Sequence, residues 1–379
     1  MTEKTIIHII TGLRDGGAEG ALYRLVTDDR NADHIVVSLT GEDDYGEPLR
    51  DAGIEVHALG LSAKNAPAVA WRLMKLIKQA GPDVIVQTWM YHADVIGGII
   101  ARLAGVKKVY WGLRSGSLDQ KLNKKSTLAF VKLARFLSGR LPTKIISCSE
   151  RAALEHIDYG YAADMFDVVH NGYDLEQMAF NSNARRMVRD RYAIPESAFL
   201  VGMVARFDPQ KDHANLFEAV KRTQEKYPDV RILLVGRGMT PENMELRALI
   251  EAHIPHAKDK IHLAGPRKNI PDYYSAMDVH VLSSAYGEGF PNVVAEGMAC
   301  ERPTIATDVG ETDVILGGIG TLVPARDSDA LAMAINDAIR VKSEVPKDFL
   351  AIGKASRQSI VDRFGIAAMI DGFHNVWGK

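Results

Sequence analysis

The chain has 379 residues, of which 46% are hydrophobic, so it is too long for one typical core and predicts two domains. Its 46 Lys and Arg nearly balance its 48 Asp and Glu, which leaves no basic excess that would indicate a nucleic-acid-binding protein. The two cysteines, Cys148 and Cys300, lie far apart in the sequence and predict neither a disulfide framework nor a zinc site.

The start of the chain and its hydropathy favour a cytoplasmic protein. Residues 1–10 lack the profile of a signal peptide. No apolar run reaches the roughly 18 residues that a membrane-spanning helix requires. With so few cysteines, a reducing cytosol is the simplest compartment.

Short apolar runs alternate with amphipathic helical patterns along the whole chain. The expected strands are 5–10, 34–39, 56–59, 84–87, 108–111, 144–148 and 167–169, and then 199–204, 231–235, 260–263, 279–282, 304–306 and 320–323. Because these runs are continuously apolar, they predict strands buried on both faces of a parallel sheet. The series restarts near Phe199, so we expect an α/β protein of two Rossmann-like doubly wound domains that face each other across a cleft.

The domain boundary is predicted between the two series of strands. Asn171-Gly172 marks a turn, and a polar, Arg-rich stretch follows at 181–191. We therefore assign residues 1–180 to the first domain and 181–360 to the second. A final helical pattern covers 351–376, and its last part, 361–379, can cross back to the first domain.

A glycine turn joins the first strand to the first helix at Gly16-Gly17. Such a turn suits an anion, because backbone N–H groups point outward at a helix start and no Cβ blocks close approach. The spacing is neither G-x-G-x-x-G nor a P-loop, which argues against a dehydrogenase. The alternative is a plain tight turn.

The second domain opens with a strand that leads directly to Arg206, and Lys211 follows in the next loop. Two cations at the carboxyl end of a strand can clamp a diphosphate, Arg through its fork and Lys as a point charge. The alternative is a surface loop with solvated charges.

Two carboxylates, Glu288 and Glu296, stand eight residues apart in an otherwise apolar run. Burying a carboxylate is costly unless a partner compensates, and a polyhydroxyl ligand can do so by donating hydrogen bonds to it. Pro291 and Asn292 mark the start of a helix whose positive end suits a phosphate. The alternative is a solvent-facing Glu296 with Glu288 in a mobile loop.

His92 follows the strand 84–87, again at the carboxyl end of a strand. A histidine there can donate a hydrogen bond or act as a base, and a structural histidine is the alternative. Asp94 is a weaker candidate, because placement in the first turn of a helix would explain it.

Residues 121–144 form a basic segment with interleaved apolar residues and no acidic residue. This pattern is typical of an amphipathic helix that binds an anionic membrane surface. The alternative is a helix that faces the core and exposes a solvated cationic side.

Together these motifs resemble the family 4 glycosyltransferases, retaining enzymes of the GT-B fold, over nearly the whole chain. Gly16-Gly17 is similar to the family's N-terminal glycine loop, and residues 171–174 to its Asn-Gly-Val-Asp segment. Arg206 and Lys211 match the segment that clamps the donor. The span from Glu288 to Glu296 matches the Glu-x7-Glu motif, the most specific of these signals.

The resemblance implies an enzyme that uses a nucleotide-diphosphate sugar, with a UDP-sugar as the expected donor, held mainly by the second domain. Glu288 would contact the donor sugar, Glu296 the ribose, and His92 would lie near the reacting sugar. Arg206 and Lys211 would neutralise the diphosphate, so that no metal or other cofactor is needed. The remaining donor-binding residues would be Gly16, Gly17, Phe290, Pro291, Asn292 and Val293, mainly through backbone amides.

The implied reaction moves a hexosyl or N-acetylhexosaminyl group to a hydroxyl of a glycan or lipid-linked acceptor, bound by the first domain, in cell-surface polysaccharide or lipopolysaccharide biosynthesis. The acceptor hydroxyl would attack from the face that the diphosphate leaves, with retention. The basic segment would place the enzyme on the inner face of the cell membrane. The sequence departs from the family pattern at Pro291, Gly297, Glu301 and Glu311, which leaves the sugar undefined.

Two other functions remain open on the sequence. A nucleotide-sugar epimerase can share the same two-domain fold. A non-catalytic two-domain sugar-binding protein of the periplasmic kind is also compatible with it, although the absent signal-peptide profile and the Arg206/Lys211 pair argue against it.

Overall fold

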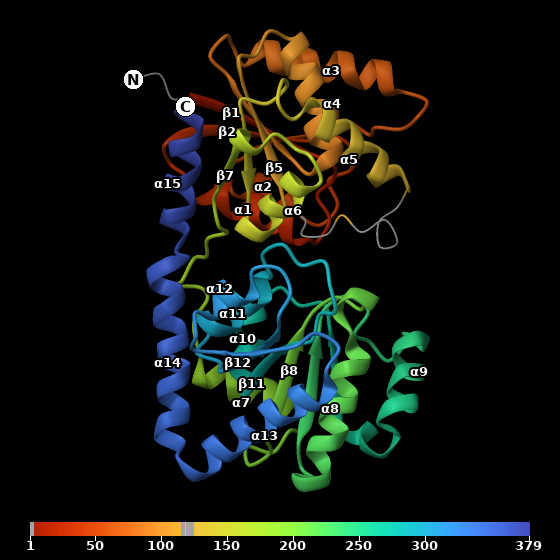
Figure 1. The fold of residues 1–379 in the computed structure, drawn as a ribbon, viewed down its shortest axis with the longest axis vertical. Helices are drawn as coiled ribbons and strands as arrows, with labels where there is room; N and C mark the ends of the chain where they lie inside the picture. The colour runs from red at the N-terminus through yellow and green to blue at the C-terminus, as the bar shows by residue number, and fades with distance from the viewer. Residues whose placement is uncertain (1–3, 115–117, 119–124) are drawn as a thin grey trace. The chain divides into compact units, whose positions relative to one another are not determined.

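The structure is a computed structural model that describes residues 4–114, 118 and 125–379. The chain folds into two compact units, shown as a ribbon in Figure 1. The first unit comprises Met1–Gly172 and Ile366–Lys379, and the second comprises Tyr173–Gly365. The chain therefore passes between units at 172/173 and 365/366, whereas the sequence placed the domain limits at 180 and 360.

The first unit is built on a parallel sheet with the strand order β3-β2-β1-β4-β5-β6-β7. Its strands are β1 (Lys4–Ile10), β2 (Ala32–Ser38), β3 (Glu55–Ala58), β4 (Ile85–Trp89), β5 (Lys108–Leu113), β6 (Lys144–Ser147) and β7 (Phe166–Val168). Each lies within a few residues of a strand expected from the sequence. The prediction of a doubly wound parallel sheet is confirmed for this unit.

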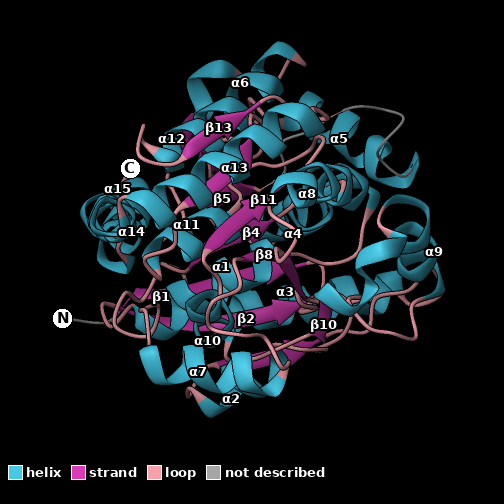
Figure 2. Ribbon diagram, turned by 90° about the horizontal axis from the view of Figure 1, so that it is seen from below, coloured by secondary structure: helices cyan, strands magenta, loops and turns pink. Residues whose placement is uncertain are grey.

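Helices cover both faces of this sheet, and Figure 2 shows how helices flank the strands. The helices are α1 (Gly17–Asp28), α2 (Gly46–Asp51), α3 (Ala66–Gln79), α4 (Tyr91–Leu103), α5 (Lys125–Leu137), α6 (Glu150–Asp158) and α15 (Ile366–Trp377). One core cluster joins the sheet to α3, α4 and α5, and a second joins the opposite face to α1, α2 and α15.

The central strand β1 shows why the strands are continuously apolar. Ile7 and Ile9 pack in the first cluster, while Ile6 and Ile10 pack in the second. Because successive side chains of a strand point to opposite faces, a strand covered on both sides is mainly apolar, and the buried His8 of β1 is hydrogen-bonded to His34 and Trp89.

The C-terminal segment ends on the first unit. The Trp377 carbonyl accepts hydrogen bonds from Lys108 Nζ and from the Tyr110 hydroxyl, both at 3.1 Å. Trp377 Nε1 donates to Gln87 Oε1 at 3.0 Å. The prediction of a single helix over 351–376 was wrong. The helix is interrupted at Phe364-Gly365, between α14 (Pro346–Arg363) and α15.

The second unit repeats the topology, with the parallel order β10-β9-β8-β11-β12-β13. Its strands are β8 (Leu200–Val204), β9 (Arg231–Val235), β10 (Ile261–Gly265), β11 (Val279–Leu282), β12 (Thr304–Thr307) and β13 (Thr321–Val323). Its helices are α7 (Ser182–Arg191), α8 (His213–Lys226), α9 (Met244–His253), α10 (Ile270–Ala276), α11 (Asn292–Ala299), α12 (Thr312–Leu316), α13 (Ser328–Glu344) and α14. The second predicted strand series is also confirmed.

The Arg-rich stretch 181–191 is a helix of the second unit rather than a linker. Asp278, which is buried, lies 3.0 Å from Arg185, 2.8 Å from Arg189 and 2.7 Å from Lys342. Burial alone would raise the pKa of the Asp278 carboxyl, but these three cations outweigh it and lower the pKa. The arginines of α7 thus hold this helix against the sheet of the second unit. The polarity of the sequence alone could not reveal that packing.

Candidate active site

The sheet of the second unit reverses its strand order between β8 and β11. In open α/β sheets, ligands bind outside the carboxyl ends of the strands at such a reversal. Arg206 and Lys211 follow β8, and Glu288 follows β11, so all three belong to the loops at this point. The two loops are tied together, because Ala285 N–H donates to the Gln210 carbonyl and the Ser283 hydroxyl to the Lys211 carbonyl, both at 2.8 Å.

Glu288 and Lys211 form a buried ion pair. Lys211 Nζ lies 2.5 Å from Glu288 Oε1, and each side chain is only 10% exposed. The Ser284 hydroxyl donates to the same oxygen at 2.6 Å. The structure therefore joins two residues that are 77 positions apart in the sequence, and each offsets the desolvation of the other.

A third loop, which follows β12, packs against the backbone of Glu288. Gly310 has φ +57°, and a Cβ there would lie 2.3 Å from the Glu288 carbonyl oxygen. The next residue, Glu311, is buried, and its N–H donates to the Gly289 carbonyl at 3.0 Å. Only glycine can occupy position 310 without strain, and the backbone of Glu311 is hydrogen-bonded to the Glu288 loop.

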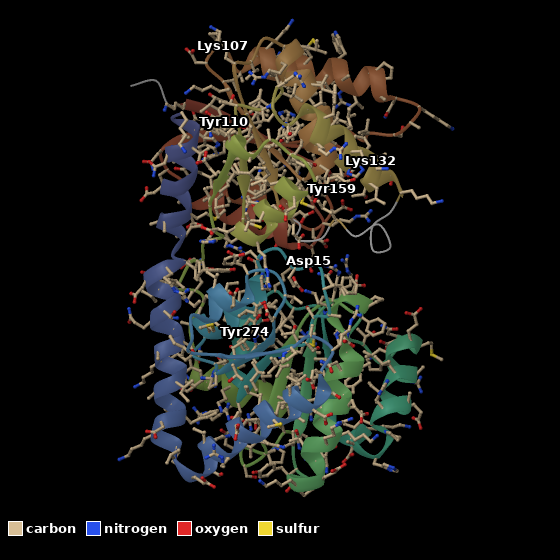
Figure 3. The ribbon with its side chains drawn as sticks, in the orientation of Figure 1. Asp15, Lys107, Tyr110, Lys132, Tyr159 and Tyr274 are labelled. Atoms are coloured by element: carbon tan, nitrogen blue, oxygen red, sulfur yellow. The ribbon has the colours of Figure 1, made fainter. Side chains whose placement is uncertain are left out.

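Glu296 lies on α11, where a tyrosine fixes it. The Tyr274 hydroxyl is 3.1 Å from Glu296 Oε2 and 3.2 Å from the Val293 carbonyl. Tyr274 is labelled in Figure 3 and comes from α10. Burial, then the nearby Glu296 charge, raises the pKa of Tyr274, so the phenol stays protonated and can donate.

The turn that precedes α11 contains the remaining donor-binding candidates. Pro291 is the N-cap of α11, and the buried Phe290 ring lies 5.4 Å from Phe364. Asn292 Oδ1 accepts a hydrogen bond of 2.6 Å from the Tyr173 hydroxyl. The first turn of α11, which includes Val293, contains no acidic residue, so the positive end of the helix dipole is not complemented from within the helix.

Arg206 behaves differently from Lys211. Its side chain is 45% exposed, and it contacts Asp208 Oδ2 at 3.1 Å and Gln210 Oε1 at 3.0 Å. The two cations expected to act together thus have separate partners, one buried and one at the surface.

Gly16 and Gly17 lie at the start of α1 in the first unit. Gly16 is the N-cap with extended backbone, and Gly17 is the first helical residue and is exposed. Glu19 stands in the first turn, and its carboxylate occupies the space that a Cβ on Gly16 would need. This helix end already has an acidic residue of its own, unlike α11.

His92 lies in the first turn of α4, at the carboxyl end of β4 and next to the strand reversal of the first sheet. Its ring is half-buried, 4.3 Å from the Phe130 ring between centroids, and burial lowers its pKa. The preceding Tyr91 hydroxyl is 2.8 Å from His156 Nε2. His156 Nδ1 lies 2.6 Å from the Ala152 carbonyl, so Nδ1 carries the proton and Nε2 accepts from Tyr91.

No group of three His, Cys, Asp or Glu side chains with metal-site geometry occurs among the described residues. An Asp-x-Asp sequence, whose two carboxylates could in principle bind a metal ion, occurs at 327–329. Both of these carboxylates have structural partners. Asp327 accepts from the Ala330 N–H as the N-cap of α13, and Asp329 pairs with Arg222.

Sequence reasoning missed the residues that hold the two glutamates. Ser284 stands four residues before Glu288, and Tyr274 stands 22 residues before Glu296, so neither spacing forms a recognisable motif. The local signal is the pair Ser283-Ser284 directly after the buried strand β11, since hydroxyls beyond the carboxyl end of a strand can face a ligand or its binding residue.

Comparisons with known proteins agree on one family. The family described as "Glycosyltransferase Family 4" matches residues 15–177, and "Glycosyl transferases group 1" matches residues 198–340. Among curated proteins, the chain is 27% identical over 310 residues to an Escherichia coli enzyme named "UDP-Gal:alpha-D-GlcNAc-diphosphoundecaprenol alpha-1,3-galactosyltransferase", covering 80% of this chain and 77% of that one. It is 26% identical over 372 residues to "Putative glycosyltransferase EpsF" of Bacillus subtilis, covering 95% and 91%.

Solved structures show the same fold. HepE from Anabaena, solved in complex with UDP-glucose, matches with a TM-score of 0.86 at 20% identity over 99% of both chains. Sucrose-phosphate synthase from Thermosynechococcus elongatus matches with a TM-score of 0.78 at 18% identity, over 99% of this chain and 98% of that one. The two matched regions span most of the chain, and each unit has the expected doubly wound sheet, so this protein belongs to the family 4 glycosyltransferases of the GT-B fold.

Proposed function

We propose that this glycosyltransferase moves a hexosyl or N-acetylhexosaminyl group, with retention, from a UDP-sugar to a hydroxyl of a lipid-linked glycan in cell-surface polysaccharide biosynthesis. The buried Glu288–Lys211 pair at the strand reversal of the second unit carries the proposal. The name of the E. coli relative specifies a UDP-sugar donor and a diphosphoundecaprenol-linked acceptor, and HepE was solved with UDP and with UDP-glucose.

Each donor-binding residue has a separate task in this proposal. Glu288 accepts hydrogen bonds from hydroxyls of the donor sugar, and Glu296 from the ribose hydroxyls. The amides at the start of α11 contact a phosphate, because no acidic residue of the first turn competes there. Gly16 and Gly17 allow the chain to approach the donor closely, provided that the Glu19 carboxylate turns away from the phosphate.

The leaving diphosphate gains negative charge as the glycosidic bond breaks. Lys211 and the more exposed Arg206 stabilise that charge, and His92 donates a hydrogen bond near the reacting sugar. The acceptor hydroxyl attacks from the same face through an oxocarbenium-like state. No carboxylate is assigned as a covalent nucleophile.

Thermal-shift measurements with UDP-, GDP- and ADP-sugars test the donor. A ligand present at 100 times its Kd stabilises the native state by about 2.7 kcal/mol. We expect UDP and UDP-sugars to raise the Tm and GDP- and ADP-sugars to leave it unchanged. A larger shift with another base would replace UDP in the proposal.

Retention and metal independence require separate measurements. The anomeric coupling in the NMR spectrum of the first-formed product should match that of the donor, and an inverted product would refute the same-face route. The rate of sugar transfer in about 5 mM EDTA should equal the rate without EDTA. In this proposal cationic side chains, rather than a divalent metal ion, stabilise the leaving diphosphate. Activity that Mg²⁺ or Mn²⁺ restores would contradict this.

Nucleotide-sugar epimerase is the remaining enzymatic alternative, and the named relatives do not favour it. Incubation with donor alone separates the two functions. A transferase leaves the donor intact or hydrolyses it slowly, whereas an epimerase produces a second nucleotide sugar.

We further propose that the first unit binds the acceptor, and that α3, α4 and α5 face an anionic membrane. Exposed apolar side chains lie on all three helices, and they are Trp71, Ile99, Leu103, Leu133 and Phe136. Asp94, which is buried, is the only acidic residue in the three helices. Lys75 and Lys78 on α3 and Lys132 on α5 are exposed, and Figure 3 labels Lys132. No described helix is both long and apolar enough to span a membrane.

The basic segment 121–144 is thus only partly described. Lys121 and Lys124 lie outside the described residues, while α5 and the chain from 138 to 144 are described. Each basic side chain near an anionic lipid surface contributes about 1 kcal/mol to the free energy of membrane binding.

Cosedimentation with phosphatidylglycerol vesicles tests the membrane proposal. Lys75→Glu combined with Lys132→Glu should reduce binding about 10-fold or more, and salt should do the same. Lys347→Glu, at an exposed position of α14 in the second unit, serves as the charge-matched control. Equal, salt-insensitive binding by all three proteins would favour a soluble acceptor.

A further inference from the structure

The turn that presents His92 is strained. β4 ends at Trp89 and α4 begins at Tyr91, and between them Met90 has φ +71° and ψ +156°. Residues with a side chain rarely adopt these angles, so the conformation costs free energy and persists only where its surroundings hold it. Such strain accumulates at functional sites, and here it lies two residues before His92.

Asp94 holds this turn from both sides. Its N–H donates to the Met90 carbonyl at 2.9 Å, and the Met90 N–H donates to the Gly112 carbonyl at 2.9 Å. Its carboxyl Oδ1 lies 2.5 Å from the Thr88 hydroxyl and accepts from the Gly112 N–H at 3.3 Å. One side chain thus connects the ends of β4 and β5 with the first turn of α4.

A count of protons shows which form of Asp94 fits. The Thr88 hydroxyl lies 2.5 Å from Asp94 Oδ1 and 3.2 Å from the Tyr110 carbonyl, but it has one proton to donate. If Asp94 is a carboxylic acid, its O–H donates to Thr88 and the Thr88 O–H donates to Tyr110, so both contacts become hydrogen bonds. An ionised Asp94 would have to share the single Thr88 proton with the Tyr110 carbonyl, and its buried Oδ2 has no hydrogen-bond partner among the described residues.

The surroundings of Asp94 favour the same neutral form. The residue is fully buried, and none of the described cations lies within ion-pair distance of it. A Cβ on Gly97 would lie 3.1 Å from Ile9 atoms, and one on Gly98 would lie 2.8 Å from Trp111 Nε1, so the two glycines let α4 approach the sheet closely. Burial therefore raises the pKa of Asp94 to about 8, although Thr88, Gly112 and Arg114 lower it in part.

We propose that Asp94, acting as a neutral carboxylic acid, is a positioning residue for glycosyl transfer, because it latches the strained turn at Met90 and thereby fixes the orientation of His92. The inference rests on the proposed role of His92. Its chemistry is a hydrogen bond donated by a buried acid, and Asp94 itself touches neither donor nor acceptor.

Few other groups around Asp94 change charge near neutral pH. Arg114 follows β5 and keeps its charge, and burial raises the pKa of Tyr161, which follows α6. Burial lowers the pKa of His92 on α4. It also lowers the pKa of His156, which lies on α6 and pairs with Tyr91, to about 4. A loss of turnover near pH 8 that disappears in Asp94→Asn is therefore attributable to Asp94, whereas one that persists belongs to another group such as the buried Cys148 thiol beside Arg114.

Four variants separate the positioning role of Asp94 from its charge. Asp94→Asn keeps the shape and can donate from its amide, so kcat should stay within about 3-fold and the alkaline decline of wild-type kcat should disappear. Asp94→Ala releases the turn and should lower kcat about 10- to 100-fold, since a 1 Å misplacement of a catalytic group costs about that much, with little change in donor KM. Thr88→Val should resemble Asp94→Ala more than Thr88→Ser does.

A readout at His92 does not depend on turnover. In NMR spectra of histidine-labelled protein, assigned with His92→Gln, the His92 ring signals should move in Asp94→Ala and coincide with wild type in Asp94→Asn. Ile100→Val, at a buried position of the same helix, is the control for general destabilisation and should leave both kcat and these signals unchanged.

The outcomes distinguish this inference from the proposed function. If His92→Ala retains wild-type kcat, the role of His92 fails, and the inference fails with it. If His92→Ala loses activity while Asp94→Ala retains it, only the positioning role of Asp94 is refuted. If Asp94→Asn loses as much as Asp94→Ala, a charged aspartate is needed and the neutral acid is refuted.

Discussion

Asp94 and Glu288 occupy equivalent places in the two units, yet they are held in opposite ways. β4 and β11 are the strands beside the order reversal in their respective sheets, and each buried carboxyl group follows its strand. Glu288 has Lys211 at 2.5 Å, whereas the hydrogen-bond partners of the Asp94 carboxyl within the described part of the chain are the Thr88 hydroxyl and the Gly112 N–H. A cation from the neighbouring loop thus favours the ionised form of Glu288, as the proposed donor contact requires, whereas burial without such a cation favours the neutral form of Asp94.

The largest expected effect comes from removing the paired carboxylate. Glu288→Ala should lower kcat/KM about 10³-fold, because it removes the group proposed to bind the donor sugar and leaves Lys211 buried without its partner. Glu288→Gln should lose nearly as much while keeping the fold, as judged by circular dichroism. Near-normal turnover in both variants would remove Glu288 from the mechanism.

Removing the cation should have the next largest effect. Lys211→Met keeps the length of the side chain but not the charge, and we expect kcat to fall about 10²-fold as the leaving diphosphate loses its stabilisation. A donor with a better leaving group should recover part of this loss in steady-state assays. If Lys211→Met and Lys211→Arg behave alike, shape rather than charge is what the site requires.

Glu296 provides a test within the second unit. Glu296→Gln should raise the donor KM about 10-fold, or roughly 1.4 kcal/mol, with kcat little changed, because ribose contacts are the same in the ground state and transition state. Tyr274→Phe, which removes the hydroxyl that holds Glu296, should cause a smaller change in the same direction. A fall in kcat without a change in KM would place Glu296 nearer to the reacting sugar.

The smallest effect is a pH dependence of stability in the first unit. The folded protein holds a proton on Asp94 up to a pKa of about 8, whereas the pKa of an ordinary Asp carboxyl in the unfolded chain is 3.8, so raising the pH between these values favours the unfolded chain. The stabilisation from this group is complete below the lower value and is lost as the pH rises through the upper one. Within this window the group loses about 1.4 kcal/mol of stabilisation per pH unit, so we expect the Tm to fall by roughly 3–5 °C per pH unit from pH 6 to about 8 and then to level off.

Tryptophan fluorescence isolates this effect. All four tryptophans, Trp71, Trp89, Trp111 and Trp377, belong to the first unit, so their emission follows its unfolding alone. Asp94→Asn should remove the pH dependence, and Glu288→Gln in the second unit should leave it unchanged. A persistent slope in Asp94→Asn would assign it to another group.

Most of the fold could be predicted from the sequence. Thirteen runs are mainly apolar because most strands of the two sheets are buried, and this property is visible in the letters alone. The break at Phe364-Gly365 was missed because the helical pattern continues across it. The Arg-rich helix α7 was not recognised because polarity suggests solvent, whereas Arg189 is buried against Asp278.

Two departures from the family pattern become clear only in the structure. At Gly297, where the family usually has Ala, a Cβ would lie 2.7 Å from Nδ1 of the buried His280 on β11, so the glycine makes room for the histidine. At Glu301, where the family has Gly, the backbone has φ +60°, and the glutamate accepts a conformation that glycine adopts without strain.

The sequence by itself determined the two sheets, the family and the candidate residues, because hydrophobic runs and ordered motifs are local properties of the chain. Only the tertiary structure decided the partners: Lys211 and Ser284 for Glu288, Tyr274 for Glu296, and Thr88 with Gly112 for Asp94. Charge state and hydrogen bonding depend on what lies within about 3 Å, and parallel sheets bring those neighbours from strands and loops that are distant in sequence.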